Sequence, residues 1–360
     1  LLKNAAAGLA IISIALLLIS FACTQKADSR SSGRVLPTAD QGLKLLGNRF
    51  LTLCTVVRVN QIEVSRERVE GEDESAVHGP DEARTFREAV EKGWPGARIT
   101  WAFTWRALLD ERPNYQELRK LVVSYHEKFG DEITFLPGGY FANMYNSREQ
   151  VNRDLHDGLN LVSKMVGGGY RPRAVIAGFL SADNLRYLAE EEDIHVCQGN
   201  IWSQYAVDNG DGEGSISYPY YPSREHFCKP AQRKADQIDC VNLDGWTVDF
   251  VTARYSGSQQ HRVYSRQGVG PIETLLFQGT EVGTQEMIGT TAAHFDTGFA
   301  LNGFAWVTNI WELCLVEGRK IYGYSGRNGM DGLAIWLAEI KRRWPETRVI
   351  THGEFGMIWR

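Results

Sequence analysis

The sequence predicts an α/β protein whose parallel strands close into a barrel carrying a long insertion rich in Gly and Tyr. Apolar runs alternate with amphipathic helical patterns along residues 48–202, as in a parallel sheet covered by helices. The first strand is apolar at almost every position, so we expect both of its faces to be buried. No GxGxxG motif follows it, which argues against an open dinucleotide-binding sheet and favours a closed barrel.

Each predicted strand is a short apolar run, and the first is rich in β-branched residues. Helical patterns separate the early strands, so neighbouring strands are expected to run parallel. The expected strands span residues 48–64, 97–105, 132–140, 171–180, 194–202, 240–255 and 347–359.

The predicted helices have one apolar face, and two of them have a recognisable start. The helix over residues 81–96 is expected to have its N-cap at Asp81 and to stop at Pro95, and the next but one starts at Ser147. Residues 210–270 interrupt the alternation, and we interpret them as an insertion that contributes to the active site. The remaining expected helices span residues 114–130, 147–166, 181–193, 303–316 and 330–345.

The composition is that of a globular chain and excludes several classes of protein. The chain has 360 residues, of which 43% are hydrophobic and 23% are charged, so it is long enough for one large barrel. Lys and Arg number 39 against 44 Asp and Glu, giving a net charge of −5. The chain has no excess of basic residues that would attract the phosphates of a nucleic acid, so no nucleic-acid partner is expected.

The N-terminus resembles a bacterial lipoprotein signal. An apolar run over residues 5–22 follows Lys3 and ends at Ala22, immediately before Cys23. We expect residues 1–22 to be a signal peptide, Cys23 to be lipidated, and residues 23–47 to tether a barrel over residues 48–360 to a membrane of the cell envelope. A simple signal peptide or a membrane anchor is the alternative. Because the sequence ends at Arg360 directly after a predicted strand, we also expect the barrel to continue beyond it.

The other five cysteines are scattered, and no CxxC pair suggests zinc or redox chemistry. In an oxidising compartment, a disulfide between Cys228 and Cys240 would bridge a loop of the insertion. Buried free thiols are the commoner state of such residues, and both alternatives stay open from the sequence.

Candidate catalytic residues follow from the rule that parallel barrels act on substrates at the carboxyl ends of their strands. Three carboxylates lie toward the carboxyl ends of predicted strands or in the loops after them, and they are expected to converge on that face: Glu63, Asp208 and Glu354. Glycoside hydrolysis needs two such carboxylates, about 5–5.5 Å apart for retention or about 6.5–9.5 Å for inversion. Glu354 or Glu63 would act as general acid and Asp208 as nucleophile or base, with His352 binding substrate or tuning the acid. Structural ion pairing is the alternative for each carboxylate.

Aromatic and polar residues at the same ends suggest a carbohydrate-binding cleft. Flat rings with a polar edge offer sugars an apolar platform together with hydrogen bonds, and packing of the insertion onto the barrel is the alternative for each ring. The expected substrate-binding residues are Arg58, Asn60, Trp105, Trp202, Tyr205, Tyr220, Tyr221, His226, Trp246 and Asp249.

The histidine pattern does not predict a metal centre. A zinc-dependent deacetylase needs a carboxylate and two convergent His, and the segment after the third strand contains no His. We therefore expect neither metal nor cofactor.

Several segments together resemble a family of uncharacterised secreted bacterial proteins described as glycoside hydrolase/deacetylases. The matching segments lie between Asn48 and Arg360, and the most specific is the insertion, QGNIWSQYAVDNGDGEGSISYPYYPSREHFCKPAQ. The resemblance implies the distorted seven-stranded β/α barrel shared by polysaccharide deacetylases and family 57 glycoside hydrolases. The paired Asp of the first group and the His-rich first strand of the second are both missing here.

Three hypotheses for function remain. The leading one is a metal-independent hydrolase that acts on a polysaccharide or oligosaccharide outside the cytoplasm. The second is a carbohydrate deacetylase with an unusual metal site formed by Glu63, His226 and His352. The third is a lipoprotein that binds glycans without catalysis.

Overall fold

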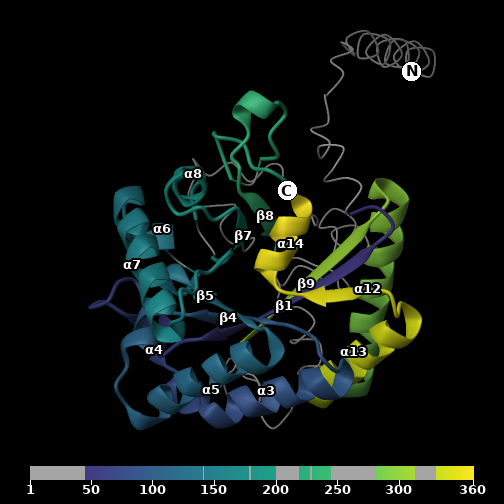
Figure 1. The fold of residues 1–360 in the computed structure, drawn as a ribbon, viewed down its shortest axis with the longest axis horizontal. Coiled ribbons are helices and arrows are strands. Elements are labelled where there is room, and N and C mark those ends of the chain that lie inside the picture. Colours follow the sequence, from purple (N-terminus) through teal and green to yellow (C-terminus); the bar gives the residue numbers. More distant parts are fainter. Residues whose placement is uncertain are drawn as a thin grey trace, which may run out of the picture. The chain divides into compact units, whose positions relative to one another are not determined.

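The computed structural model describes residues 45–140, 142–177, 180–199, 219–227, 229–244, 280–312 and 330–360. Within these residues, parallel strands form the centre of the molecule and helices cover them (Figure 1). The predicted α/β barrel-type fold is confirmed.

The first sheet is organised around β1 (Arg49–Val57), which pairs in parallel on both edges. One edge pairs along its length with β9 (Ala305–Glu312). The other edge pairs first with β10 (Arg348–Ile350) and then with β4 (Thr100–Phe103), which in turn pairs with β5 (Glu132–Phe135). Because β10 takes only the first half of that edge, it ends at mid-height of the sheet.

The second sheet holds three parallel strands: β6 (Val175–Ile176), β7 (Val196–Gly199) and β8 (Val241–Asp244). The Thr134 hydroxyl on β5 donates to the carbonyl of Ala174, just before β6, and so links the two sheets. Among the described residues, seven parallel strands follow one another in the order β9, β1, β4, β5, β6, β7, β8, with β10 as an additional short strand.

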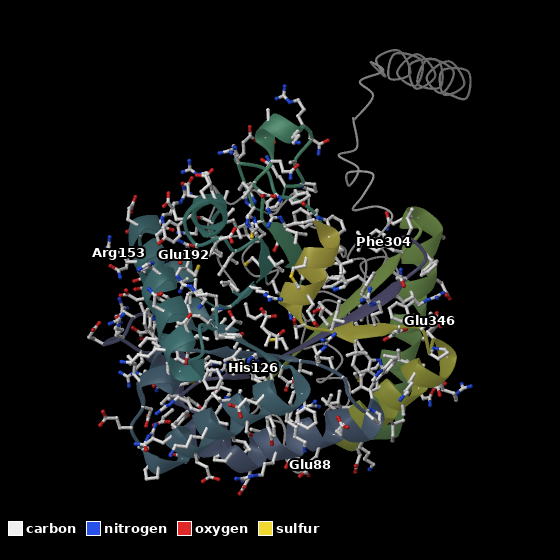
Figure 2. All side chains as sticks on the ribbon, viewed as in Figure 1. Glu88, His126, Arg153, Glu192, Phe304 and Glu346 are labelled. Atoms are coloured by element: carbon white, nitrogen blue, oxygen red, sulfur yellow. The ribbon has the colours of Figure 1, made fainter. Side chains whose placement is uncertain are left out.

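Helices cover the outer faces of these strands, and their charged side chains, such as Glu88 and Arg153, point outward (Figure 2). Alternate residues of β1, such as Leu51 and Leu53, pack against the helices in the main hydrophobic core. The long helices are α3 (Pro80–Gly93), α5 (Pro113–Phe129), α7 (Arg148–Val166), α8 (Ala182–Glu191), α12 (Thr280–Asn302) and α13 (Met330–Arg343). Shorter elements are β2 (Asn60–Ile62), β3 (Glu70–Asp73), the 3-10 turns Ser75–Val77, Pro137–Tyr140 and Lys234–Asp236, α4 (Trp105–Leu109) and α6 (Ala142–Tyr145).

The helix α14 (His352–Trp359) packs over the ends at which the strands begin. The Phe355 ring lies 5.4 Å from the ring of Phe50 on β1 and 5.9 Å from that of Trp306 on β9. A Cβ on Gly356 would lie 1.7 Å from a methyl carbon of Val196 on β7, so only glycine permits this approach. The amino-terminal opening between the strands is thus filled by apolar side chains.

Two elements differ from the sequence prediction. Residues 303–316 were predicted to be helical, but residues 305–312 form β9, in which Trp306 and Thr308 face inward and Val307 faces the helices. The predicted closing strand over residues 347–359 stops at Ile350 and continues as α14, because Thr351 and Glu354 form a capping box. The last strand is therefore followed by a helix.

Smaller differences concern element ends. The predicted first strand breaks after Val57 and resumes as the short β2. The N-cap of α3 is Gly79, whose N–H donates to Glu82, and not Asp81. The predicted start of α7 at Ser147 is confirmed, and its hydroxyl accepts from the N–H of Gln150.

The thiols of Cys54, Cys197 and Cys240 are buried and free, and burial raises the pKa of each. Cys228, the expected partner of Cys240, lies outside the described residues. None of the helices in the described part of the chain has the length and apolar character needed to span a bilayer. The predicted leader, with Cys23, also lies outside it.

Candidate functional site

A buried charged cluster lies at the carboxyl end of β1, the end at which parallel barrels bind substrates. Arg58 directly follows β1, and its Nε and Nη2 donate to the two oxygens of Glu74 at 2.5 and 3.1 Å. The backbone N–H of Arg58 donates to Nδ1 of His78 at 3.3 Å, and Nε2 of His78 lies 3.4 Å from Glu74. The side chains of Arg58 and Glu74 are only 3% and 4% exposed, so the pair is held in one geometry.

The protonation state of this cluster is set by its own members. Burial alone raises the pKa of Glu74, but the hydrogen bond from His78 and the charge of Arg58 outweigh burial and lower it to about 2. Glu74 therefore stays ionised at neutral pH and is a poor proton donor. The cluster supplies a fixed ion pair beside the strand ends.

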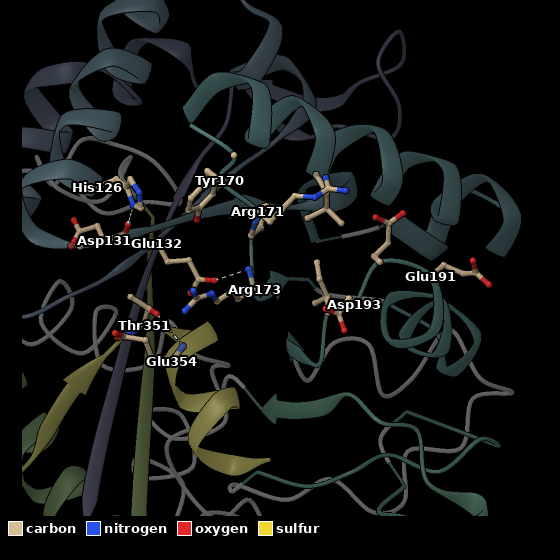
Figure 3. Close-up of a pocket in the computed structure, with 16 residues that line it drawn as sticks. His126, Asp131, Glu132, Tyr170, Arg171, Arg173, Glu191, Asp193, Thr351 and Glu354 are labelled. Atoms are coloured by element: carbon tan, nitrogen blue, oxygen red, sulfur yellow. Dashed lines mark hydrogen bonds between the residues drawn. The ribbon is translucent and has the colours of Figure 1, made fainter. Parts of the chain in front are cut away.

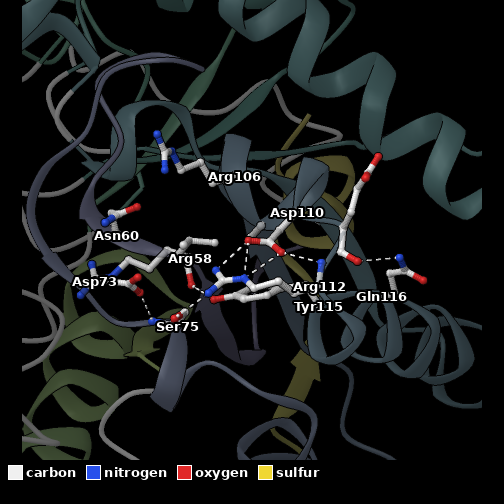
Figure 4. A network of polar contacts seen from close by, with 12 residues as sticks. Arg58, Asn60, Asp73, Ser75, Arg106, Asp110, Arg112, Tyr115 and Gln116 are labelled. Carbon is white, nitrogen blue, oxygen red and sulfur yellow. Dashed lines mark hydrogen bonds and ion pairs between the residues drawn. The ribbon is translucent and has the colours of Figure 1, made fainter.

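The segment that carries Glu74 is fastened to α5 by a second network (Figure 4). The Tyr115 hydroxyl donates to the carbonyl of Arg58 at 2.8 Å, and burial raises the pKa of that hydroxyl. Arg112 donates to both oxygens of Asp110 and, at 3.0 Å, to the hydroxyl of Ser75. These contacts hold the backbone of Arg58 and the side chain of Ser75, the residue that follows Glu74.

Glu63 also lies at this end of the sheet, and backbone groups occupy its carboxylate. One oxygen accepts from the N–H groups of Val59 and Asn60 at 2.9 and 3.2 Å, and the other accepts from the N–H of Arg106 at 2.8 Å. The side chain is fully buried. This geometry locks the turn after β1 to the start of α4.

Two expected substrate-binding residues at the same end are buried in packing. Trp105 is 1% exposed, its ring packs edge-on against Phe135 at 4.9 Å, and the Arg66 guanidinium lies 4.3 Å from its centroid. Asn60 is 7% exposed and pairs with Asp73 across β2 and β3. Neither side chain offers an open stacking surface.

Glu354 and His352 lie at the other end of the sheet, because β10 stops at the level of Thr52 on β1. At about 3.3 Å per residue, the carboxyl end of β1 lies about 16 Å further along the strand. Glu354 caps α14 by accepting from the N–H of Thr351 at 3.0 Å, and it pairs with Arg98 at 2.6 Å. The expected convergence of Glu63 with Glu354 is therefore wrong.

His352 points into the barrel interior, away from Glu354. Its Nδ1 lies 2.9 Å from the Thr100 hydroxyl, and its Nε2 contacts the amide oxygen of Gln198. Complete burial lowers the pKa of His352 to about 3, so the ring is neutral at physiological pH. It belongs to a polar layer between the strands in which the hydroxyls of Thr52 and Thr308 lie 2.8 Å apart.

The described part of the insertion leads into the beginning of β8, so it lies at the amino-terminal end of the strands. Tyr221 packs 6.1 Å from the ring of Trp359 on α14, and the Tyr220 hydroxyl accepts from Asn242 at 2.7 Å. His226 is buried and stacks on Phe227. The structure thus places these three expected substrate-binding residues away from the carboxyl ends of β1 and β4. Five further predicted site residues lie outside the described residues: Trp202, Tyr205, Asp208, Trp246 and Asp249.

The sequence matches, over residues 43–360, a family described as a domain of unknown function with a solved structure (DUF3863). The chain belongs to this family. No curated protein matches the sequence significantly.

Solved structures of similar fold support the resemblance seen in the sequence. A Parabacteroides distasonis protein provisionally described as a glycoside hydrolase/deacetylase is 49% identical, with a TM-score of 0.77 over 88% of this chain and 72% of that one. A Pseudomonas aeruginosa protein provisionally described as a polysaccharide deacetylase is 12% identical, with a TM-score of 0.51 over 86% and 90% of the two chains. A GH57-type branching enzyme from Pyrococcus horikoshii is 11% identical, with a TM-score of 0.49 over 84% and 69%. The 49% identity to the Parabacteroides distasonis protein confirms the predicted family resemblance.

The fold neighbours raise the question of a metal, which deacetylase chemistry often uses. Within the described ranges, no three His, Cys, Asp or Glu side chains converge to form a metal site. Glu63 lies at the carboxyl end of the strands, whereas His352 lies between their amino-terminal halves and His226 lies in the insertion. The metal site hypothesised from these three residues is not formed.

Sequence analysis missed Glu74 and His78, which organise the described part of the site. Both lie within the charged segment EGEDESAVHGP, between the predicted strand over residues 48–64 and the predicted helix over residues 81–96. Their spacing of four residues was the available signal, since residues so spaced often face the same side of a short helical turn.

Proposed function

We propose that the protein is a carbohydrate-active hydrolase whose catalytic centre lies where the parallel strands end. The observation that carries this proposal is the 49% identity, over 88% of the chain, to a protein provisionally described as a glycoside hydrolase/deacetylase. Parallel barrels place their reacting groups at these strand ends. The buried ion pair of Arg58 and Glu74 provides a rigid charged wall there.

The contacts of the described carboxylates guide the choice of catalytic residues. Glu63 accepts three backbone hydrogen bonds, and we assign it a positioning role. Glu354 caps a helix at the opposite end. Asp208 follows β7 in the chain and Asp249 follows β8, and these two strands are hydrogen-bonded neighbours. We therefore propose Asp208 as nucleophile or base and Asp249 as a substrate ligand or the partner acid.

The test is product release from a panel of bacterial, plant and host glycans, measured with and without a chelator. New reducing ends would show glycosidic cleavage, and released acetate would show deacetylation. We expect Asp208→Asn to abolish turnover and Glu354→Gln to retain most of it in protein that remains folded. Equal turnover by Asp208→Asn and wild type would refute the assignment. Binding of a glycan without any turnover would favour a non-catalytic binding protein.

We further propose that the protein is anchored to a membrane of the cell envelope through lipid on Cys23. The support is the apolar leader that ends immediately before this cysteine. Cells fed a labelled fatty acid should label the wild-type chain and should leave Cys23→Ala unlabelled. Labelling of Cys23→Ala would contradict the proposal.

A further inference from the structure

A pocket of 680 Å³ lies at the end of the barrel where the strands begin, remote from the proposed catalytic centre (Figure 3). Its walls come from the segments that follow α5 and α7, the end of α8 and the start of α14. The volume is within the range of about 300–1,000 Å³ that is typical of small-molecule sites.

The floor of this pocket is a buried carboxyl group in a fixed position. Glu132, the first residue of β5, is 7% exposed and accepts from the N–H groups of Gly353 and Arg173 at 2.8 and 3.2 Å. Burial raises the pKa of Glu132, which reduces the negative charge at the floor. The group is pre-positioned to hydrogen-bond a ligand without a strong local field.

The rim carries both donors and acceptors, and three of its carboxylates contact an arginine or a histidine side chain. Glu354 pairs with Arg98 at 2.6 Å, Glu192 lies 2.8 Å from His156, and Asp193 lies 2.9 Å from His195. The alternation of paired acids with Arg171 and Arg173 leaves no large field of one sign. Such a lining suits a neutral ligand with many hydroxyl groups better than an anion or a cation.

Two exposed rim side chains are available to such a ligand. The Arg173 side chain is exposed and lines the pocket, and Nη1 of its guanidinium lies 3.4 Å from the sulfur of Met357. Glu191, at the end of α8, is exposed across the pocket from it. A guanidinium and a carboxylate in the lining of one pocket can each form hydrogen bonds with hydroxyl groups of a ligand.

A second pocket of 500 Å³ adjoins the first and shares Glu354 with it. Ile350, Met357 and Ile358 line it, together with Arg98 and Arg348. Apolar contacts beside hydrogen-bonding groups match the apolar faces and polar edges of sugar rings. Two adjoining pockets suit a chain of linked rings better than a single small molecule.

We propose that this end of the barrel binds a neutral oligosaccharide and holds polysaccharide close to the enzyme without taking part in catalysis. The inference rests on the proposed function as a carbohydrate-active protein. It names a second glycan site, lined by Glu132, Arg173, Glu191 and Glu354, which the catalytic proposal does not need.

The test compares the full chain with the double variant Arg173→Ala/Glu191→Ala. The matched control is Arg186→Ala/Glu190→Ala, which removes the same two residue types from the same region at exposed positions outside the pocket. Maltotriose, cellotriose and triacetylchitotriose serve as probes in titration calorimetry, and turnover is measured on the polysaccharide panel described above. Thermal unfolding shows that each variant is folded.

We expect the pocket variant to lose the oligosaccharide binding that does not depend on the catalytic centre. The loss should appear as about tenfold weaker affinity, or as one fewer oligosaccharide bound per protein, while turnover of short substrates stays unchanged. The control variant should bind as the wild type does. Equal binding by wild type and pocket variant, in protein that turns over a glycan, would overturn this inference and leave the proposed function standing. Wild-type protein that neither binds nor turns over any glycan would overturn both.

Discussion

The replacement Glu74→Gln tests whether the buried cluster at the end of β1 is held together by charge. Glutamine keeps the shape of the side chain and removes its negative charge, so Arg58 would be left buried without its counter-ion. The pKa of Glu74 is about 2, against 4.5 for an unperturbed glutamate. At about 1.36 kcal/mol for each pH unit, the ionised form contributes about 3 kcal/mol to the free energy of unfolding at pH 7. Breaking one partner of a buried ion pair costs about 3–5 kcal/mol in other proteins, which agrees with this value.

The same reasoning fixes how the effect depends on pH. A carboxylate whose pKa is lower in the folded state stabilises the fold above its unfolded pKa and loses that contribution as pH falls toward the folded pKa. The window for Glu74 is therefore about pH 5 to 2. The difference in free energy of unfolding between wild type and Glu74→Gln should fall from about 3 kcal/mol at pH 7 to about 2 kcal/mol at pH 3.5.

Urea denaturation at several pH values measures this difference directly. The matched control is Glu72→Gln, because Glu72 lies two residues earlier and is exposed. We expect this control to change the free energy of unfolding by less than about 0.5 kcal/mol. A loss below about 1 kcal/mol for Glu74→Gln at pH 7, or a difference that does not narrow on acidification, would refute the argument.

Three further predictions concern packing. Gly356→Ala should lower the free energy of unfolding by about 1–3 kcal/mol in urea titrations, because the alanine Cβ would overlap Val196. Val196→Ala in the same chain should recover part of that loss. Strict additivity of the two free-energy changes would contradict this overlap. Leu337→Ala, at a fully buried position, should cost about 2–5 kcal/mol by thermal or urea unfolding, whereas Ile335→Ala, half exposed on the same helix, should cost far less; similar losses would be inconsistent with the observed packing. Alkylation of the folded protein at pH 8, mapped by mass spectrometry, should leave the buried thiols of Cys54, Cys197 and Cys240 unmodified until denaturant is added. Rapid modification of these thiols in the native protein would argue against their burial.

Local sequence signals determined most of the elements around the barrel. Ser147 began α7 as expected because its hydroxyl satisfies an N–H that the helix itself leaves free. The capping box of Thr351 and Glu354 was also visible in the sequence, and it overrides the apolar run that suggested a strand. Such signals act over a few residues, so the sequence contains them in full.

Whether an apolar run became a strand or a helix was decided by tertiary pairing. Residues 303–316 are apolar almost throughout, and periodicity does not separate a buried strand from a buried helix in such a run. The ladder with β1, from Arg49 to Val56, supplies the hydrogen bonds that make residues 305–312 a strand. Those partners lie some 250 residues away in the chain, beyond the reach of local patterns.

The candidate site shows the same division. The sequence by itself determined the family resemblance, the parallel α/β fold and the end of the strands at which chemistry is expected. Only the tertiary structure separated Glu63 from Glu354, since β10 pairs with the first half of β1 and ends there. It also brought Arg58 together with Glu74 and His78. The ion pair of Arg58 and Glu74 depends on side-chain geometry over a few ångströms. Order along the chain carries no information about such distances.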